Sequence, residues 1–348
     1  MTRVADYSQV LIKASVERSR LLSKRQIKSL AECRSLDEMA SQLRGTAYES
    51  LLSDIREPNA AKLQYAFKEE MIRVCKKILA YSPKRIRDSL ENYIRYLEVE
   101  NLEILIKMKS MGAPYDSILS MLHLSVDEIL GLKGRFIQAA KASDVSSAIE
   151  AFRNTIYEPA LSEGLKRYEE TRSTRFFDFS LDRTYYDSLL NSAKSLPKAD
   201  RSAALLLAGM RVDAFNIITI IRSKLLDYPP HLTFWAITRR FYLLSENQIR
   251  SMVSSGDVGS ILDSVKETFY GRFLTQQRSI EEIVMAFERK VDSFVMERIN
   301  RMRISGPFTI SSPLDVILRK EAEVKNLTLI SSGIEFGWKP EDISRFLI

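Results

Sequence analysis

The 348-residue sequence is poor in residues that interrupt regular backbone structure, with only twelve glycines and ten prolines. Together they make up about 6% of the chain, roughly half of their usual share in globular proteins. This scarcity excludes collagen-like and linker-like chains and disfavours β architectures with many turns. A hydrophobic fraction of 45% with 28% charged residues also excludes a disordered chain. We therefore expect a folded protein that is mostly helical.

Cysteine is equally scarce, since Cys33 and Cys75 are the only two in the chain. Two cysteines cannot build a disulfide framework, and their spacing matches no metal-binding motif. We expect both to be small core residues without thiol chemistry.

The sequence also lacks the residues and motifs of an active site. Its only histidines are His123 and His231. It contains no phosphate-binding glycine loop, no dinucleotide-binding fingerprint and no nucleophile elbow. We therefore predict no catalytic residues, no metal site, no cofactor and no small-molecule substrate.

No hydrophobic run is free of charge over the length of a membrane span. The most apolar window, residues 202–221, contains Arg211 and Asp213 near its middle. Each would cost about 2.5–3.5 kcal/mol at the centre of a bilayer. We expect this window to be a buried helix, and the charged residues in the first twenty positions do not fit a signal peptide.

The charge balance is mildly basic, with a net charge of +7 and an isoelectric point near 9.2. Basic clusters occur at residues 83–87 and 298–303, but acids are interspersed along most of the chain. No helix-turn-helix, zinc or aromatic RNA-reading pattern accompanies them, so we expect no nucleic-acid partner. A positive field of this size fits an anionic protein or a membrane surface equally well.

A fourteen-residue run that ends in Thr-x-Tyr occurs three times. The three runs are residues 35–48, 144–157 and 257–270, and they end at Tyr48, Tyr157 and Tyr270. The tyrosines are 109 and 113 residues apart, so the chain is predicted to be a threefold repeat of about 112 residues. The corresponding domains are residues 1–114, 115–230 and 231–348.

A sequence typical of a helix N-terminus precedes each of the three Thr-x-Tyr runs. Serine is followed three residues later by Glu or Gln, which is the pattern of a capping box. The three pairs are Ser23 with Gln26, Ser125 with Glu128, and Ser245 with Gln248.

Each repeat also contains a helix with an acid and an asparagine three residues apart, and therefore on one face. The pairs are Glu98 with Asn101, Asp213 with Asn216, and Glu323 with Asn326. Lys109 and Lys224 follow their acids by three helical turns, whereas the third copy has Ile334 there. Buried carboxylates and amides need partners, so we interpret these residues as a polar network that locks the helices within each repeat.

These features resemble the C subunit of the archaeal A-type ATP synthase, the counterpart of the d subunit in the eukaryotic V-type proton pump. The resemblance rests on the Thr-x-Tyr ends, the acid–Asn helices, the motif at 182–186 and the closing segment 323–347. It covers essentially the whole chain. The sequence departs from the family at Ala47 and Ile156, where the family often has proline, and in the missing base of the third Asn helix.

The resemblance implies three all-helical domains around a pseudo-threefold axis, forming a funnel. It implies a non-catalytic rotor subunit, peripheral on the cytoplasmic face of the cell membrane, in a complex that couples ATP synthesis to proton or sodium transport. The implied partners are the proteolipid subunits of the membrane rotor ring and the D and F subunits of the central stalk. From the residues alone, a helical-repeat scaffold and an RNA-binding helical protein remain open alternatives.

Overall fold

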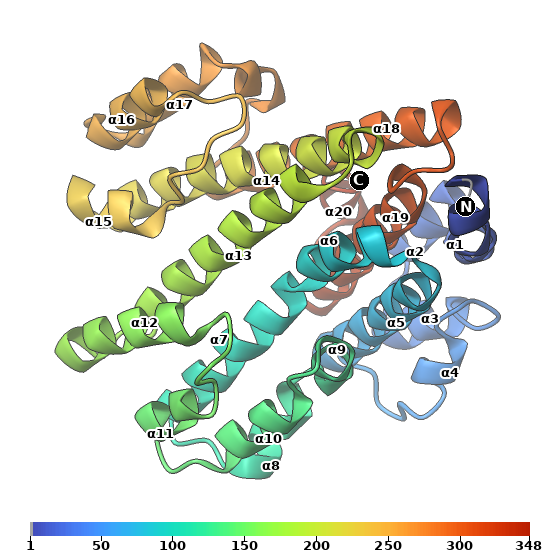
Figure 1. Cartoon of the computed structure of the whole chain (residues 1–348). Coiled ribbons are helices and arrows are strands. Elements are labelled where there is room, and N and C mark those ends of the chain that lie inside the picture. Colours follow the sequence, from blue (N-terminus) through green and yellow to red (C-terminus); the bar gives the residue numbers. More distant parts are fainter. Residues whose placement is uncertain (1–2) are drawn as a thin grey trace. The chain divides into compact units, whose positions relative to one another are not determined.

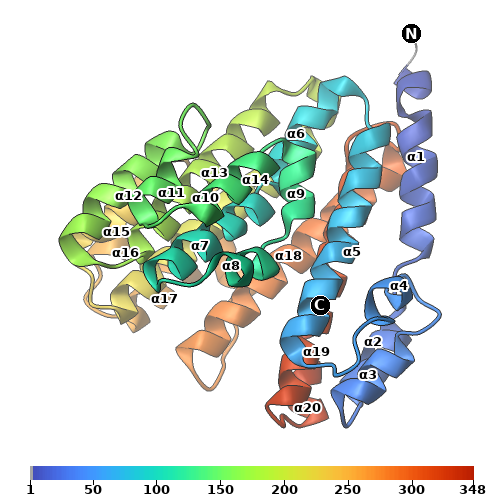
Figure 2. The same ribbon diagram turned by 90° about the horizontal axis from the view of Figure 1, so that it is seen from below.

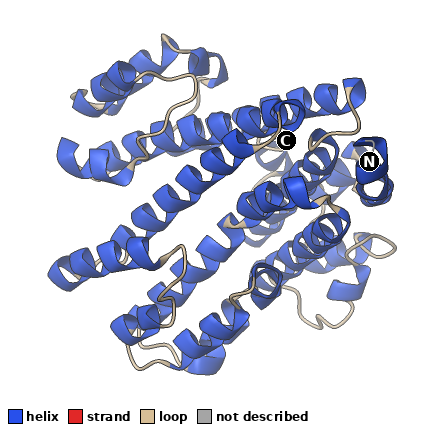
Figure 3. Ribbon diagram, in the orientation of Figure 1, coloured by secondary structure: helices blue, strands red, loops and turns tan. Residues whose placement is uncertain are grey.

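Every regular element in the described residues, 3–348, of the computed structural model is a helix (Figure 3). The predicted all-α fold is confirmed. The chain forms two compact units, one from residues up to 87 together with 275–348, called unit 1, and one from 88–274, called unit 2. The division into three domains at residues 114 and 230 stays a prediction.

Unit 1 combines the two ends of the chain (Figures 1 and 2). Its helices are α1 (Arg3–Ser19), α2 (Lys24–Ala31), α3 (Leu36–Gln42), α4 (Glu49–Leu52), α5 (Ala60–Tyr81), α18 (Ile280–Ser305), α19 (Ser311–Glu335) and α20 (Pro340–Ser344). Helix α6 (Lys84–Ile94) leads from this unit into the next.

Helix α19 forms the core of unit 1, because α5, α18 and α1 all pack against it. Its buried residues lie all around the helix and not on one stripe, as expected for a helix enclosed by others. On α5, the apolar face that includes Leu63 and Phe67 is buried. Cys75 on α5 and Cys33 are both buried with free thiols, which confirms them as core residues.

Unit 2 contains the middle of the chain. Its helices are α7 (Tyr96–Ser110), α8 (Tyr115–Met121), α9 (Leu124–Leu130), α10 (Lys133–Lys141), α11 (Val145–Glu150), α12 (Glu158–Thr171), α13 (Arg175–Ser195), α14 (Lys198–Leu225), α15 (Pro230–Ala236), α16 (Glu246–Ser254), α17 (Val258–Lys266) and the 3₁₀ helix η1 (Phe269–Phe273). Helix α13 packs against α12, α14 and α7.

Helix α14 is the buried helix that the sequence predicts for residues 202–221. It is the one helix in residues 3–348 with the length and apolar composition of a membrane span. However, 83% of its most apolar window is buried inside the protein. Asp213, near the middle of the window, is fully buried and hydrogen-bonded, which identifies α14 as a core helix of unit 2.

The three repeated runs share one local structure. The first side chain of each run caps a short helix by accepting a backbone N–H three residues later. The caps are Ser35 to Glu38 at 3.2 Å, Asp144 to Ser147 at 2.8 Å, and Asp257 to Ser260 at 2.8 Å. The threonine of each run donates to a carbonyl three residues earlier and accepts the tyrosine N–H two residues later. This turn fixes the direction in which each tyrosine leaves the chain.

Two of the three predicted capping boxes are confirmed, at Ser23–Gln26 and Ser245–Gln248. The capping box predicted at Ser125–Glu128 is wrong, because α9 begins at Leu124 with His123 at its N-cap, which places Ser125 inside the helix. The reason is that Asn101 binds the backbone of His123 and fixes the start of α9 at that residue.

Candidate functional site

Tyr48 joins the N-terminal and C-terminal segments of unit 1. Its buried hydroxyl donates to Glu323 Oε1 at 2.6 Å. Lys320 Nζ, also buried, lies 2.9 Å from the tyrosine oxygen and 2.8 Å from Glu323 Oε1. The backbone N–H of Leu22 donates to the other carboxylate oxygen. A charged hydrogen-bond cluster therefore links α19 to two segments near the start of the chain.

Tyr157 makes the corresponding bond in unit 2. Its hydroxyl donates to Glu98 Oε2 at 2.5 Å, and Arg95 lies 3.3 Å from the same oxygen. Glu98 is fully buried on α7, and its Oε1 has no hydrogen-bond partner among residues 3–348. Burial raises the pKa of Glu98, while Tyr157 and Arg95 oppose that shift by stabilising the carboxylate.

Tyr270 completes the set. Its hydroxyl donates to Asp213 Oδ2 at 2.8 Å. No base occupies the position three residues before this acid; Met210 stands there, and its sulfur lies 3.6 Å from the tyrosine oxygen. The Asp213 carboxylate instead accepts the backbone N–H groups of three successive residues, 242–244, at 2.7–3.1 Å. Backbone donors thus replace the missing cation.

The three bonds follow one rule, in which each acid binds the tyrosine of the next repeated run. Glu98 binds Tyr157, Asp213 binds Tyr270, and Glu323 returns to Tyr48. The interpretation that these acids lock helices within one repeat is therefore wrong. Each acid is buried where its helix meets another run, so the tyrosine of that run is the partner within its reach.

The tyrosine hydroxyls in these junctions stay protonated. Burial and the adjacent carboxylate raise the pKa of Tyr48, Tyr157 and Tyr270 well above the ordinary value near 10. A hydroxyl of this kind donates a hydrogen bond to a carboxylate and is neither a nucleophile nor a base at neutral pH. The arrangement can hold segments together, and it offers no catalytic group.

Each of the three asparagines forms a hydrogen bond with the backbone of the residue 22 positions further along the chain. Asn101 accepts the N–H of His123, Asn216 that of Thr238 and Asn326 that of Ile348, at 2.9–3.1 Å. Their side-chain amides donate back to carbonyls in the same segments. Each amide therefore ties the end of a following helix–turn segment to the long helix that carries it.

Sequence reasoning missed the bases that complete two junctions, Arg95 and Lys320, each three residues before its acid. The signal was present in the sequence at two of the three copies. Lys109, which the sequence places on the same side of the helix as Glu98 but three turns later, donates to the carbonyl of Ala142 at the end of α10. It serves as a helix C-terminal cap and not as part of the junction.

An acidic face lies between α7 and α13, which pack together in unit 2. It contains Glu100, Glu103, Asp178 and Asp182, the last from the motif at 182–186. Burial raises the pKa of Glu103, and its neighbours Asp182 and Asp178 raise it further. Burial and nearby carboxylates likewise raise the pKa of Asp182 to about 7. Carboxyl groups on this face therefore keep their protons to a higher pH than exposed ones do.

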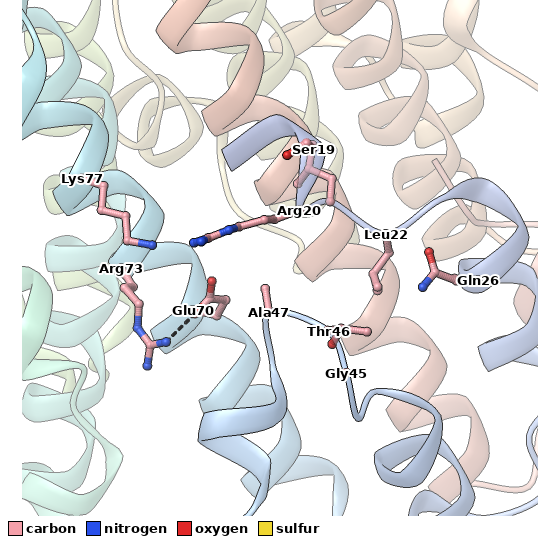
Figure 4. A pocket seen from close by; sticks show the side chains of 11 residues that line it. Ser19, Arg20, Leu22, Gln26, Gly45, Thr46, Ala47, Glu70, Arg73 and Lys77 are labelled. Atoms are coloured by element: carbon pink, nitrogen blue, oxygen red, sulfur yellow. Dashed lines mark ion pairs between the residues drawn. The ribbon is translucent and has the colours of Figure 1, made fainter. Parts of the chain in front are cut away.

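A polar cleft of about 530 Å³ opens in unit 1 near the Tyr48 junction (Figure 4). Arg20, Arg73 and Lys77 surround the buried Glu70, whose carboxylate lies 3.1 Å from the Arg73 guanidinium. Burial raises the pKa of Glu70, and the neighbouring cations act against that shift. Arg20 and Lys77 also pair with the buried Glu17, at 3.6 and 3.1 Å. Three cations against the two acids Glu17 and Glu70 leave one excess positive charge, which suits acidic groups of a partner.

No group of three or more His, Cys, Asp or Glu side chains that could hold a metal ion occurs within residues 3–348. His123 is buried and His231 is exposed on the first turn of α15. The geometry is thus one of tied segments and charged surfaces.

Comparison with known proteins gives a consistent assignment. The sequence model of the ATP synthase (C/AC39) subunit family matches residues 13–346. The C subunit of the A-type ATP synthase of Methanocaldococcus jannaschii is 24% identical, over 99% of this chain and 87% of that protein. The proteins of the same name from Thermococcus kodakarensis and Methanothermobacter thermautotrophicus are 24% and 26% identical, over 98% and 93% of this chain and 90% and 82% of their own lengths.

The resemblance read from the Thr-x-Tyr ends and the acid–Asn helices is confirmed by these matches, which span nearly all of the chain. A subunit of this family is non-catalytic and works within a multi-subunit, membrane-associated complex. The chain therefore belongs to the ATP synthase (C/AC39) subunit family.

Proposed function

We propose that this chain is the central-rotor subunit that connects the membrane proteolipid ring to the D and F subunits of the stalk in an A-type ATP synthase. It sits on the cytoplasmic face of the membrane and transmits torque between the ring and the catalytic head, so that ATP synthesis is coupled to proton or sodium transport. Three helical domains around a funnel provide the socket for the stalk. Membership of the family supports this proposal, as do relatives named as the C subunit of the A-type ATP synthase.

The observation that carries the proposal is the set of tyrosine–acid junctions between successive repeats. A rotor part must resist shear between its segments while it turns. Close-packed helices transmit strain with little compliance. Charge-assisted hydrogen bonds in a buried environment add directional ties at the places where successive segments meet. The junction of Glu323 with Tyr48 matters most, because it ties the C-terminal segment to the N-terminal one.

Polar surfaces of the chain pair with the stalk. The cleft around Glu70, with Arg20, Arg73 and Lys77, supplies the positive charge for such a contact. Docking through charges favours correct seating and makes assembly reversible and sensitive to salt.

The test is purification of the tagged chain from its native membranes in a gentle detergent, with the co-purifying proteins identified by mass spectrometry. We expect a proteolipid, the stalk subunits and the catalytic-head subunits. Recovery of the chain alone, or with RNA, would refute the proposal. A second test depletes the chain and measures ion-driven ATP synthesis in membrane vesicles, which should stop while the detached head still hydrolyses ATP.

A further inference from the structure

Three large apolar side chains are exposed at the C-terminal ends of the long helices that carry the acid–Asn pairs. Met111 follows α7, Leu226 follows α14 and Phe336 follows α19. Their exposed fractions are 75%, 43% and 72%. Two belong to unit 2 and one to unit 1, and within unit 2 α7 and α14 run in the same direction (Figure 1).

Met111, Leu226 and Phe336 occupy equivalent positions in the three copies of the acid–Asn helix. Each lies 13 residues after the acid of its helix and is the C-cap of that helix. In all three copies the next residue has a positive φ: 69° at Gly112, 53° at Asp227 and 68° at Gly337. The N–H of the residue after that donates to a carbonyl five residues earlier, at 2.8–3.0 Å, as in a Schellman motif.

The helix end does not itself require an exposed apolar side chain. The Schellman motif uses the backbone of the C-cap residue and the positive φ of the residue after it, so a polar side chain would serve equally at the cap. Single exposed apolar residues are common on protein surfaces and need no explanation. The same exposure at three equivalent positions is different, because it repeats with the fold.

Each position lies in a small surface of common character. Leu225 and Trp338 add exposed apolar area beside Leu226 and Phe336. An exposed base stands near each cap: Lys107, Arg222 and Lys339. We call Met111, Leu226 and Phe336 the apolar tips. A partner surface that fits them is apolar at the points of contact and acidic around them.

We propose that the apolar tips are the anchors by which this chain seats on the membrane rotor ring, each on an equivalent site of that ring. The inference rests on the proposed function and assigns the contact residues for it. Three equivalent anchors fit a partner that offers the same site repeatedly, and a ring of identical proteolipid subunits does so. A single monomeric partner would present only one such site.

Three anchors on one rigid partner act together. Transfer of one such side chain out of water is expected to change the affinity roughly 10- to 100-fold. Met111 and Leu226 belong to the same unit, so once one of them binds the other binds at a high effective concentration, and their combined effect exceeds that of either alone. Each single substitution should weaken ring binding, and the triple substitution should abolish it.

The experiment uses the full chain and the detergent-purified proteolipid ring from the same membranes. Binding to the immobilised ring is measured for the wild type, for M111S, L226S and F336S, and for the triple variant. The matched control is Ile304→Ser, since Ile304 is 67% exposed at the end of α18 and is not a tip. Circular dichroism and capture of the D and F stalk subunits report folding and the other interface.

Graded losses in the single variants and loss of ring binding in the triple variant, with helicity, stalk capture and I304S unchanged, would support the inference. Wild-type affinity in the triple variant would overturn it, as would an equal loss in I304S. If the wild type captures the stalk but never the ring, the proposed function fails and not only the assignment of the tips. Binding of the wild type to protein-free lipid vesicles, lost in the triple variant, would overturn the ring as the occupant.

Discussion

Replacing Lys320 by methionine removes the lysine cation from the Tyr48 junction. Lys320 and Glu323 are both buried, with 2% and 5% of their surfaces exposed. Methionine fills a similar volume but donates no hydrogen bond. Glu323 then keeps Tyr48 and the Leu22 N–H but loses the charge 2.8 Å away, and Glu70 loses a cation that acts on it.

The expected cost follows from this geometry. Breaking a buried ion pair by removing one partner typically costs about 3–5 kcal/mol, because the remaining charge is left uncompensated. Tyr48→Phe removes one hydrogen bond to a charged group and should cost less, about 1.5–3 kcal/mol. The double variant K320M/E323Q buries neither of the two charges, so it should recover much of the stability that K320M loses. Arg95→Met should cost less than K320M, because Arg95 is 20% exposed and solvent screens part of its attraction to Glu98.

The assay must separate the two units, since two-state unfolding cannot be assumed for a chain with two compact parts. Hydrogen exchange followed by mass spectrometry meets this need. In K320M the amides of α19 and α5 should exchange faster, in proportion to the loss of stability, whereas those of α14 in unit 2 should not change. Lys28→Met is the matched control, since Lys28 is exposed. Equal protection of α19 in K320M and K28M would refute the reasoning, and so would a larger loss in Y48F than in K320M.

Three further predictions concern other parts of the fold. Burial raises the pKa of Asp182 from 3.8 to about 7, so the folded state binds its proton more tightly than the unfolded state does. The stability this provides is complete below about pH 4 and is lost as the pH rises to about 7; the urea midpoint should therefore fall less between pH 4 and pH 8 in D182N than in the wild type. Asn326→Ala removes the bonds to Ile348 at a cost of about 1–3 kcal/mol, and limited proteolysis should then cut near α20 first. Gly271→Ala places a Cβ 2.3 Å from the backbone oxygen of Lys266, so calorimetry should show a lower Tm, whereas Gly256→Ala, which meets nothing within 4 Å, should change it little.

The helical fold and the tyrosines and acids of the junctions could be predicted from the sequence. Low glycine and proline content indicates helices, and the charged residues within the apolar window 202–221 indicate that its helix is buried in the protein. The repeated runs drew attention to Tyr48, Tyr157 and Tyr270, and the acid–Asn spacing to their partners. Both signals are local, because each lies within a few turns of one segment.

The pairing between copies could not be predicted in this way. The three tyrosines stand in the same motif and so do the three acids, so nothing local tells Glu98 to bind Tyr157 and not Tyr48. The packing of α19 against α5, α2 and α3 brings Glu323 to the first run. Lys320 escaped notice because Met210 replaces the base in the second copy, where backbone N–H groups of 242–244 do its work. The cleft around Glu70 was equally hidden, since Arg20 and Arg73 are 53 positions apart in the sequence.

The union of both chain ends in unit 1 has a consequence for synthesis on the ribosome. Residues up to 87 are synthesised before α19, which packs against α5 and supplies Glu323. At about 5–20 residues per second, the apolar face of α5 stays without its native cover for tens of seconds. Unit 2 is continuous in sequence and can fold during that interval. A circular permutant that starts at residue 275 and joins residue 348 to residue 1 would place α19 before α5 in the order of synthesis and should shorten that interval.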